Sequence, residues 1–273
     1  MRILALLAAL ASQAAPEAPR FPFDAEAAVR FRAEYARASG LPLEIENSLG
    51  VKLVLIPPGR FEMGPNGSRQ RVSLSKPFYL GVAEVTHAQY RAWKPDHRVE
   101  GSEEAFQEGD RPAAGLSWED ARAFCAWLGE RPEEKAAGRA YALPTSAQWE
   151  WAARAGSKED YPFGDKAKLA EHAWFNHTYT PNPKHETGGR GRQPVMRLKP
   201  NPWGLHDLFG NVWEWCADRP EDPATGERRD PIMRGGGWRS GGSHCTTVAH
   251  DPGDPRLRAD HVGFRLACAA PAP

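Results

Sequence analysis

One stretch in the second half of the chain sets the character of the fold: Trp203-Gly204-Leu205-His206-Asp207-Leu208-Phe209-Gly210-Asn211-Val212-Trp213-Glu214-Trp215. It is rich in aromatic residues and glycine and has no clear periodicity, which predicts irregular structure. Asp207 and Glu214 place two carboxylates around a turn centred on Gly210. Such oxygen ligands, with intervening backbone carbonyls, suit Ca²⁺ better than zinc or copper. The alternative is a capped turn in which both carboxylates accept backbone N–H groups.

The remaining chain combines a few helices with short strands and long loops. Helices are expected to begin at three polar caps, Thr86, Ser117 and Thr145, because apolar residues follow each cap at helical spacing. The third helix is expected to end at Gly156. Short strands are expected at residues 51–56, 61–63, 71–74, 78–80 and 263–268. The predicted class is α+β in one domain, with long loops that are functional or held by ions.

The composition limits the classes of partner. Thirty-five basic residues balance thirty-five acidic ones in 273 residues, so the formal net charge is zero. That balance argues against non-specific nucleic-acid binding and against a polybasic membrane contact. Twenty-six glycines and twenty-five prolines predict many turns. No stretch after the N-terminus approaches membrane-spanning length, so no membrane span is expected.

The first 46 residues differ in texture from the rest. Residues 1–14 combine Arg2, an apolar run and a Ser12-Gln13-Ala14 cleavage pattern, which predicts a signal peptide and a secreted or periplasmic protein. Residues 15–46 form a leader, with a short helix expected from Asp24 to Ser39 that lies on the domain or is tethered to it. The domain itself is expected to span residues 47–273.

Four cysteines occur without a CxxC motif, at Cys125, Cys216, Cys245 and Cys268. An even number in an oxidising compartment permits disulfides, with three connectivities. Cys125 lies on the apolar face of the helix that Ser117 starts, so we interpret it as a small core residue.

An ordered series of short motifs resembles the formylglycine-generating enzyme, or sulfatase-modifying factor, family over about residues 47–269. The motifs are Phe61-Glu62-Met63-Gly64, Glu84-Val85-Thr86, Leu116-Ser117-Trp118-Glu119-Asp120-Ala121, Leu143-Pro144-Thr145 with Trp149-Glu150, Gly210-Asn211-Val212-Trp213-Glu214-Trp215, Arg234-Gly235-Gly236-Gly237-Trp238 and Gly263-Phe264-Arg265. The resemblance implies a C-type-lectin-like variant fold, low in regular secondary structure. It also implies structural calcium bound by the Asp207 and Glu214 side chains and the Gly210 and Val212 carbonyls.

The resemblance implies a copper-dependent oxidase that converts a sulfatase cysteine to formylglycine and binds Cu(I) through two cysteines after the Arg-Gly-Gly motif. In this chain the second position is Cys245, but the first is Ser240. Because Cu(I) requires soft thiolates, a hydroxyl does not complete the site. Cys245 is then a lone catalytic thiol, a disulfide partner of Cys216 or Cys268, or a buried bystander; we favour the last two.

The same region predicts a ligand cleft. Trp213 is retained from the family pattern, and Trp238, His244 and His261 lie in or beside the loop from Arg239 to Val262. The loop contains no Lys, Glu, Gln, Met or Trp, and short polar side chains on a rigid scaffold make adaptable binding surfaces. Arg234 is expected to pair with a carboxylate beneath the cleft.

Together these observations favour an exported binding or accessory module that takes an unknown protein, peptide or glycan ligand in the C-terminal cleft. Copper enters only under the alternative, an active formylglycine-generating oxidase that uses Cys245. The enzymatic activity is therefore left open by the sequence.

Overall fold

The computed structural model describes residues 16–100, 107–176, 191–221 and 226–271. Twenty helices and strands are assigned within these ranges. They are α1 (Ala25–Ser39), β1 (Glu44–Glu46), β2 (Lys52–Ile56), β3 (Gly59–Met63), β4 (Gln70–Leu74), β5 (Phe78–Gly81), α2 (His87–Arg91), α3 (Trp118–Gly129), α4 (Pro132–Ala136), β6 (Tyr141–Ala142), α5 (Ser146–Arg154), the 3₁₀ helix η2 (Lys166–Glu171), β7 (Ala173–Trp174), β8 (Phe209–Gly210), β9 (Trp213–Trp215), β10 (Ile232–Arg234), the 3₁₀ helix η3 (Gly242–His244), β11 (His250–Pro252), β12 (Val262–Gly263) and β13 (Ala267–Ala269).

Three helices begin where their polar caps predict. Thr86, Ser117 and Thr145 each accept the backbone N–H three residues further on, and each of those residues bonds back to the cap, which forms a capping box. The end of α5 differs from the prediction by one residue. Ala155 itself adopts the left-handed conformation, with φ of 41°, before Gly156.

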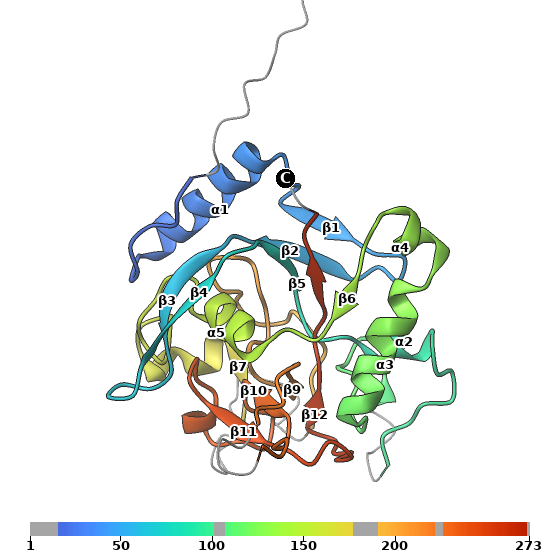
Figure 1. Cartoon of the computed structure of the whole chain (residues 1–273). Coiled ribbons are helices and arrows are strands. Elements are labelled where there is room, and N and C mark those ends of the chain that lie inside the picture. The colour runs from blue at the N-terminus through green and yellow to red at the C-terminus, as the bar shows by residue number, and fades with distance from the viewer. Residues whose placement is uncertain (1–15, 101–106, 177–190, 222–225, 272–273) are drawn as a thin grey trace, which may run out of the picture.

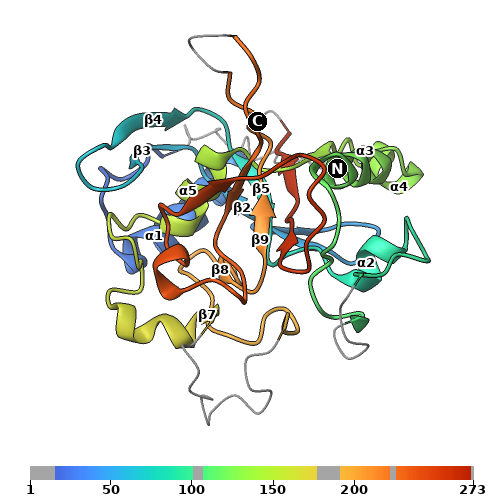
Figure 2. The same cartoon turned by 90° about the horizontal axis from the view of Figure 1, so that it is seen from below.

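Two sheets form the centre of the molecule. The larger sheet is antiparallel in the order β1-β2-β5-β13-β6, and the smaller follows the order β11-β10-β9-β12, with β12 parallel to β9. Helices α2, α3 and α4 lie on one side of the sheets, and α5 lies on the other beside the β3–β4 hairpin (Figures 1 and 2). The mixed helix and strand content confirms the predicted α+β class.

The predicted strand at residues 263–268 is wrong as a single element. Its first residue belongs to β12 in the smaller sheet and its last residues belong to β13 in the larger sheet. Between them the chain passes from one sheet to the other, where Leu266 accepts the N–H of Gly81 and Phe264 accepts the N–H of Val85. The apolar pattern marks burial on this path and does not mark continuous pairing.

The leader packs into the domain and is not merely tethered to it. Asp24 caps α1, and Phe31 is 3% exposed. Arg32 donates to the backbone oxygen of Trp203 at 2.8 Å, and the Trp203 indole donates to the backbone oxygen of Ala28 at 3.1 Å. Strand β1 also pairs with β2, so the packed unit begins well before the predicted boundary at residue 47.

The predicted signal peptide, residues 1–14, lies outside the described residues. Within the described ranges, none of the helices combines the length and the apolar character that crossing a bilayer requires.

The docking of α1 generates a test with a matched control on the same helix. Phe31→Ala removes a buried ring, so we expect a loss of about 3–5 kcal/mol in the free energy of unfolding. Val29→Ala changes a side chain that is 53% exposed, and we expect a change within about 0.5 kcal/mol. Urea denaturation followed by tryptophan fluorescence measures both. Equal effects of the two substitutions would show that the leader does not pack as described.

Candidate functional site

Glu214, near the end of the stretch 203–215, forms a fully buried ion pair with Arg265. The guanidinium donates from Nη2 to Glu214 Oε1 and from Nε to Oε2, both at 2.6 Å. The indole of Trp149 adds a third bond to Oε2 at 2.9 Å. Both side chains are 0% exposed as residues, so three of the roughly four acceptor positions of the carboxylate are filled inside the protein.

Two further carboxylates, Asp207 and Glu84, interact electrostatically with this pair, and among the described residues neither forms an ion pair of its own. Asp207 accepts the N–H of Met196 on Oδ2 at 2.6 Å, while Oδ1 has no hydrogen-bond partner among the described residues. Both oxygens of Glu84 also lack one, although the residue is only 2% exposed. Burial and the negative charges of Asp207 and Glu214 raise the pKa of Glu84 well above its usual value. Burial, with Glu214 adding to it, raises the pKa of Asp207 to about 6.

Asp207 and Glu214 lie within electrostatic reach of each other, and their predicted role as calcium ligands stays a prediction. The capped-turn alternative describes only one oxygen of Asp207, because Glu214 is bonded by side chains. Among the described residues, no three His, Cys, Asp or Glu side chains converge to hold a metal ion by themselves. A bound cation would need backbone oxygens or water as well.

The backbone around Gly210 is held in place by close contacts. Gly210 has φ of +80°, and a Cβ there would lie 2.1 Å from the backbone oxygen of Trp174. Its N–H bonds to Gly235, and the N–H of Asn211 bonds to Trp174. Val212 is fully buried. The segment that carries the predicted calcium ligands is thus fixed between β7 and the Arg-Gly-Gly motif.

Arg234 pairs with a buried carboxylate, which confirms its predicted role. Its Nη2 lies 3.0 Å from Glu150 Oε2, and its Nε and Nη2 atoms donate to the Ser146 hydroxyl at 2.9 and 2.7 Å. The other oxygen of Glu150 accepts two bonds from Arg154. This second buried network holds the chain that leads into the cleft loop.

Ser240 and Cys245 lie in the same loop but in different surroundings. The Ser240 hydroxyl accepts the N–H of Gly237 at 3.0 Å, and the Ser240 backbone bonds to Gly237 and Asn176. Cys245 is 0% exposed, and a Cβ on Gly236 would lie 2.9 Å from its sulfur. Burial raises the pKa of the Cys245 thiol to about 12.

The four predicted cleft residues differ in exposure. Trp213 is buried, and its ring meets the exposed His244 ring edge-on at 6.3 Å between centroids. Trp238 is half-buried beneath the guanidinium of Arg239, 4.5 Å from the ring centroid. His261 is half-buried and contacts Asp260 at 3.1 Å. Asp260 also pairs with Arg239 at 2.7 Å.

All four cysteines are free and buried, so the predicted disulfide from Cys245 to Cys216 or Cys268 is not formed. Cys245 and Cys216 share one apolar core cluster, whereas Cys125 and Cys268 share another. The bystander interpretation of Cys245 and the core interpretation of Cys125 agree with this burial. Burial likewise raises the pKa of Cys125 to about 12 and of Cys268 to about 11.

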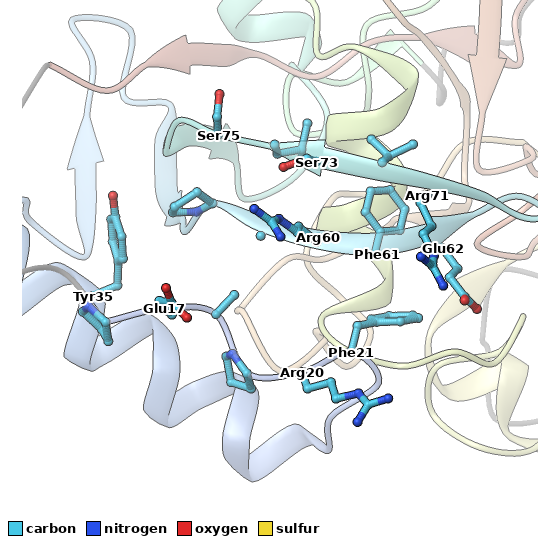
Figure 3. A pocket seen from close by; sticks show the side chains of 17 residues that line it. Glu17, Arg20, Phe21, Tyr35, Arg60, Phe61, Glu62, Arg71, Ser73 and Ser75 are labelled. Atoms are coloured by element: carbon cyan, nitrogen blue, oxygen red, sulfur yellow. The ribbon is translucent and has the colours of Figure 1, made fainter.

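A separate groove of about 830 Å³ lies between the leader and the β3–β4 hairpin (Figure 3). Leader residues 16–21 form one side, and Arg60, Phe61 and Arg71 are among the hairpin residues that line the other. None of the predicted cleft or calcium residues lines it. The leader therefore contributes a surface that the predicted site does not include.

Three residues of the buried networks, Glu84, Glu150 and Arg265, occur in the sequence motifs, but the motifs alone indicate no role for them. A signal was present in the local pattern. Glu84 and Arg265 each stand in an apolar run, Val82-Ala83-Glu84-Val85 and Phe264-Arg265-Leu266-Ala267. A charged residue inside such a run is buried with its neighbours and requires an ionic or polar partner.

Residues 41–270 match the family model described as the sulfatase-modifying factor enzyme 1-like domain. Among curated proteins, the chain is 28% identical to "Inactive C-alpha-formylglycine-generating enzyme 2" of Bos taurus, over 86% of this chain and 94% of that protein. It is 34% identical to "Formylglycine-generating enzyme" of Thermomonospora curvata, over 58% of this chain and 55% of that protein. Its relatives thus include a protein named as an inactive enzyme and one named as an enzyme.

Two solved structures share the fold over most of their length. The structure of PvdO from Pseudomonas aeruginosa has a TM-score of 0.70 and 25% identity, and covers 83% of this chain and 98% of its own. Treponema denticola variable protein 1 has a TM-score of 0.68 and 23% identity, and covers 84% and 100%.

The burial of the cysteines generates a direct test. We expect no reaction of the native protein with a thiol reagent such as DTNB at pH 8, because all four sulfurs are buried and burial raises their pKa values. After denaturation without reductant, four thiols per chain should react. A count of two in the denatured protein would mean that a disulfide forms.

Proposed function

The chain belongs to the sulfatase-modifying factor family, and on that premise we propose that it is an exported binding or accessory module without the complete Cu(I) site of the oxidases. The observation that carries the proposal is how Ser240 and Cys245, the two expected copper-ligand positions, are held. The hydroxyl of Ser240 is engaged by the backbone of Gly237, and Cys245 is fully buried.

The residues present do not fit Cu(I). The ion requires two soft sulfur ligands, and a serine hydroxyl is hard and keeps its proton near neutral pH. The remaining thiol also resists ionisation, because burial raises the pKa of Cys245 to about 12. Ser240 and Cys245 together therefore do not provide the copper site that the oxidation requires.

The binding role rests on the cleft loop. His244, Trp238 and His261 have exposed or half-exposed side chains, and Arg239 and Asp260 pair across the loop. The buried Arg234–Glu150 pair anchors this loop, because Arg234 also donates to the backbone oxygen of Thr247 at 3.2 Å. Exposed polar and aromatic side chains on a loop anchored in this way favour recognition of a protein, peptide or glycan ligand. The apolar run at the N-terminus supports export to a secreted or periplasmic location.

The proposal is tested by copper binding and by aldehyde formation. We expect the wild-type protein to bind no stoichiometric Cu(I) in competition with bathocuproine disulfonate, and to form no aldehyde on a peptide that contains Cys-Thr-Pro-Ser-Arg, given oxygen and thiol. Ser240→Cys is the matched variant, since it supplies the missing thiol, and we expect it to gain Cu(I) affinity. The enzyme of Thermomonospora curvata serves as the positive control.

The alternative is an active formylglycine-generating oxidase that uses Cys245. It predicts aldehyde formation by the wild-type protein that disappears in Cys245→Ser. That result would overturn the proposed binding role, whereas retention of the aldehyde in Cys245→Ser would indicate a contaminating activity.

We also propose structural calcium at Asp207, Glu214 and the Gly210 and Val212 carbonyls. The donor set supports it, because Asp207 Oδ1 lacks a partner and Glu214 keeps one open acceptor position beside Arg265. Bound calcium would supply positive charge that a region rich in carboxylates lacks, and would hold the loop in place.

Removal of calcium should therefore lower the melting temperature. At a calcium concentration one hundred times the Kd, binding stabilises by about 2.7 kcal/mol, which corresponds to about 5–10 °C for a chain of this size. We expect EDTA to remove this shift and Asp207→Asn to abolish it, while Asp251→Asn, an exposed control, retains it. Differential scanning calorimetry measures all three. An EDTA-insensitive melting temperature would remove calcium from the proposal.

A further inference from the structure

Three buried carboxylates gather around Arg265, two of them from the stretch 203–215. Glu84, Asp207 and Glu214 are each at most 2% exposed, and among the described residues Arg265 interacts electrostatically with all three. Arg265 donates from Nε and Nη2 to Glu214 and from Nη1 to the backbone oxygen of Gly81. If all three carboxylates are ionised, the cluster therefore carries two uncompensated negative charges.

Glu84 is the least satisfied member of the cluster. Asp207 has one bond, from Met196, and Glu214 has three. Glu84 has no bond to either oxygen among the described residues. A buried polar group without a partner costs free energy, and a buried unpaired charge costs more. A carboxylate in this state requires a proton or a cation.

Other buried glutamates in the chain show that this state is not general. Glu134 is 1% exposed, yet it accepts bonds from Ser48, Tyr141 and Arg139. Glu150 is 0% exposed and accepts bonds from Gly64 and Arg154. Glu84 thus differs from them in its surroundings and not in its burial.

We propose that Glu84 is the third carboxylate of a divalent-cation site at Asp207 and Glu214, acting on the ion through bound water. The proposal rests on the calcium site above and extends it to a residue that the motif comparison leaves without a role. Two surplus negative charges match one divalent ion. Because no three side chains converge to ligate an ion directly, Glu84 occupies the outer layer, where it accepts hydrogen bonds from water on the metal.

The proposal predicts opposite effects of one substitution with and without calcium. Glu84→Gln replaces a buried carboxyl group that lacks a hydrogen-bond partner when calcium is absent, so in EDTA its melting temperature should equal or exceed that of the wild type. With calcium, its affinity should fall about 10–100-fold, because outer partners of metal sites contribute on that scale. Isothermal titration of the full chain with CaCl₂ and melting in EDTA give the two readouts.

Glu134→Gln is the matched control, because it replaces a buried glutamate that is already bonded. We expect it to lower the melting temperature in EDTA and to leave the calcium affinity unchanged. If Glu84→Gln behaves in the same way, Glu84 is structural only and the inference fails while the calcium site stands. If the wild type itself does not bind calcium, the calcium site and the inference both fail.

Discussion

The ion pair between Glu214 and Arg265 is the interaction on which the arrangement of the molecule most depends. Glu214 lies on β9 of the smaller sheet, and Arg265 lies on the path from β12 to β13 of the larger one. The same guanidinium bonds to the backbone oxygens of Gly81 and His206. One side chain therefore joins both sheets to the loop that leads to Asp207, and loss of either partner would leave a buried charge unpaired.

The buried interactions that hold the fold are separate from Ser240 and Cys245. The buried networks at Glu214 and at Glu150 lie beneath the loop and do not include Ser240 or Cys245. The Ser240 hydroxyl makes its own local hydrogen bond, in which it accepts the N–H of Gly237.

Local rules predicted the local features well. Capping residues located the starts of α2, α3 and α5, because the cap and its reciprocal partner lie within four residues of each other. The strand at 263–268 was mispredicted because pairing is decided by distant strands, and one apolar run serves two sheets. The disulfide prediction failed for the same reason, because the distance between two cysteines depends on the whole fold.

The site was only partly predictable for a related reason. Asp207 and Glu214 stand close in sequence, so their approach follows from one turn. Glu84 precedes Asp207 by 123 residues, and Arg265 follows Glu214 by 51 residues. Both join the cluster only through the fold of the whole chain. Their burial was readable from their apolar neighbours, but the identity of the buried partner was not.

The leader adds a last connection to the same loop. Helix α1 holds the turn at Trp203 through Arg32 and the backbone of Ala28. That turn is closed by Asn201, whose side chain accepts the N–H groups of Trp203 and Leu205. The chain then runs directly into Asp207. Because the matched family domain begins at residue 41, this support comes from outside the domain. The segment before residue 41 thus supports the turn from which the chain runs into Asp207.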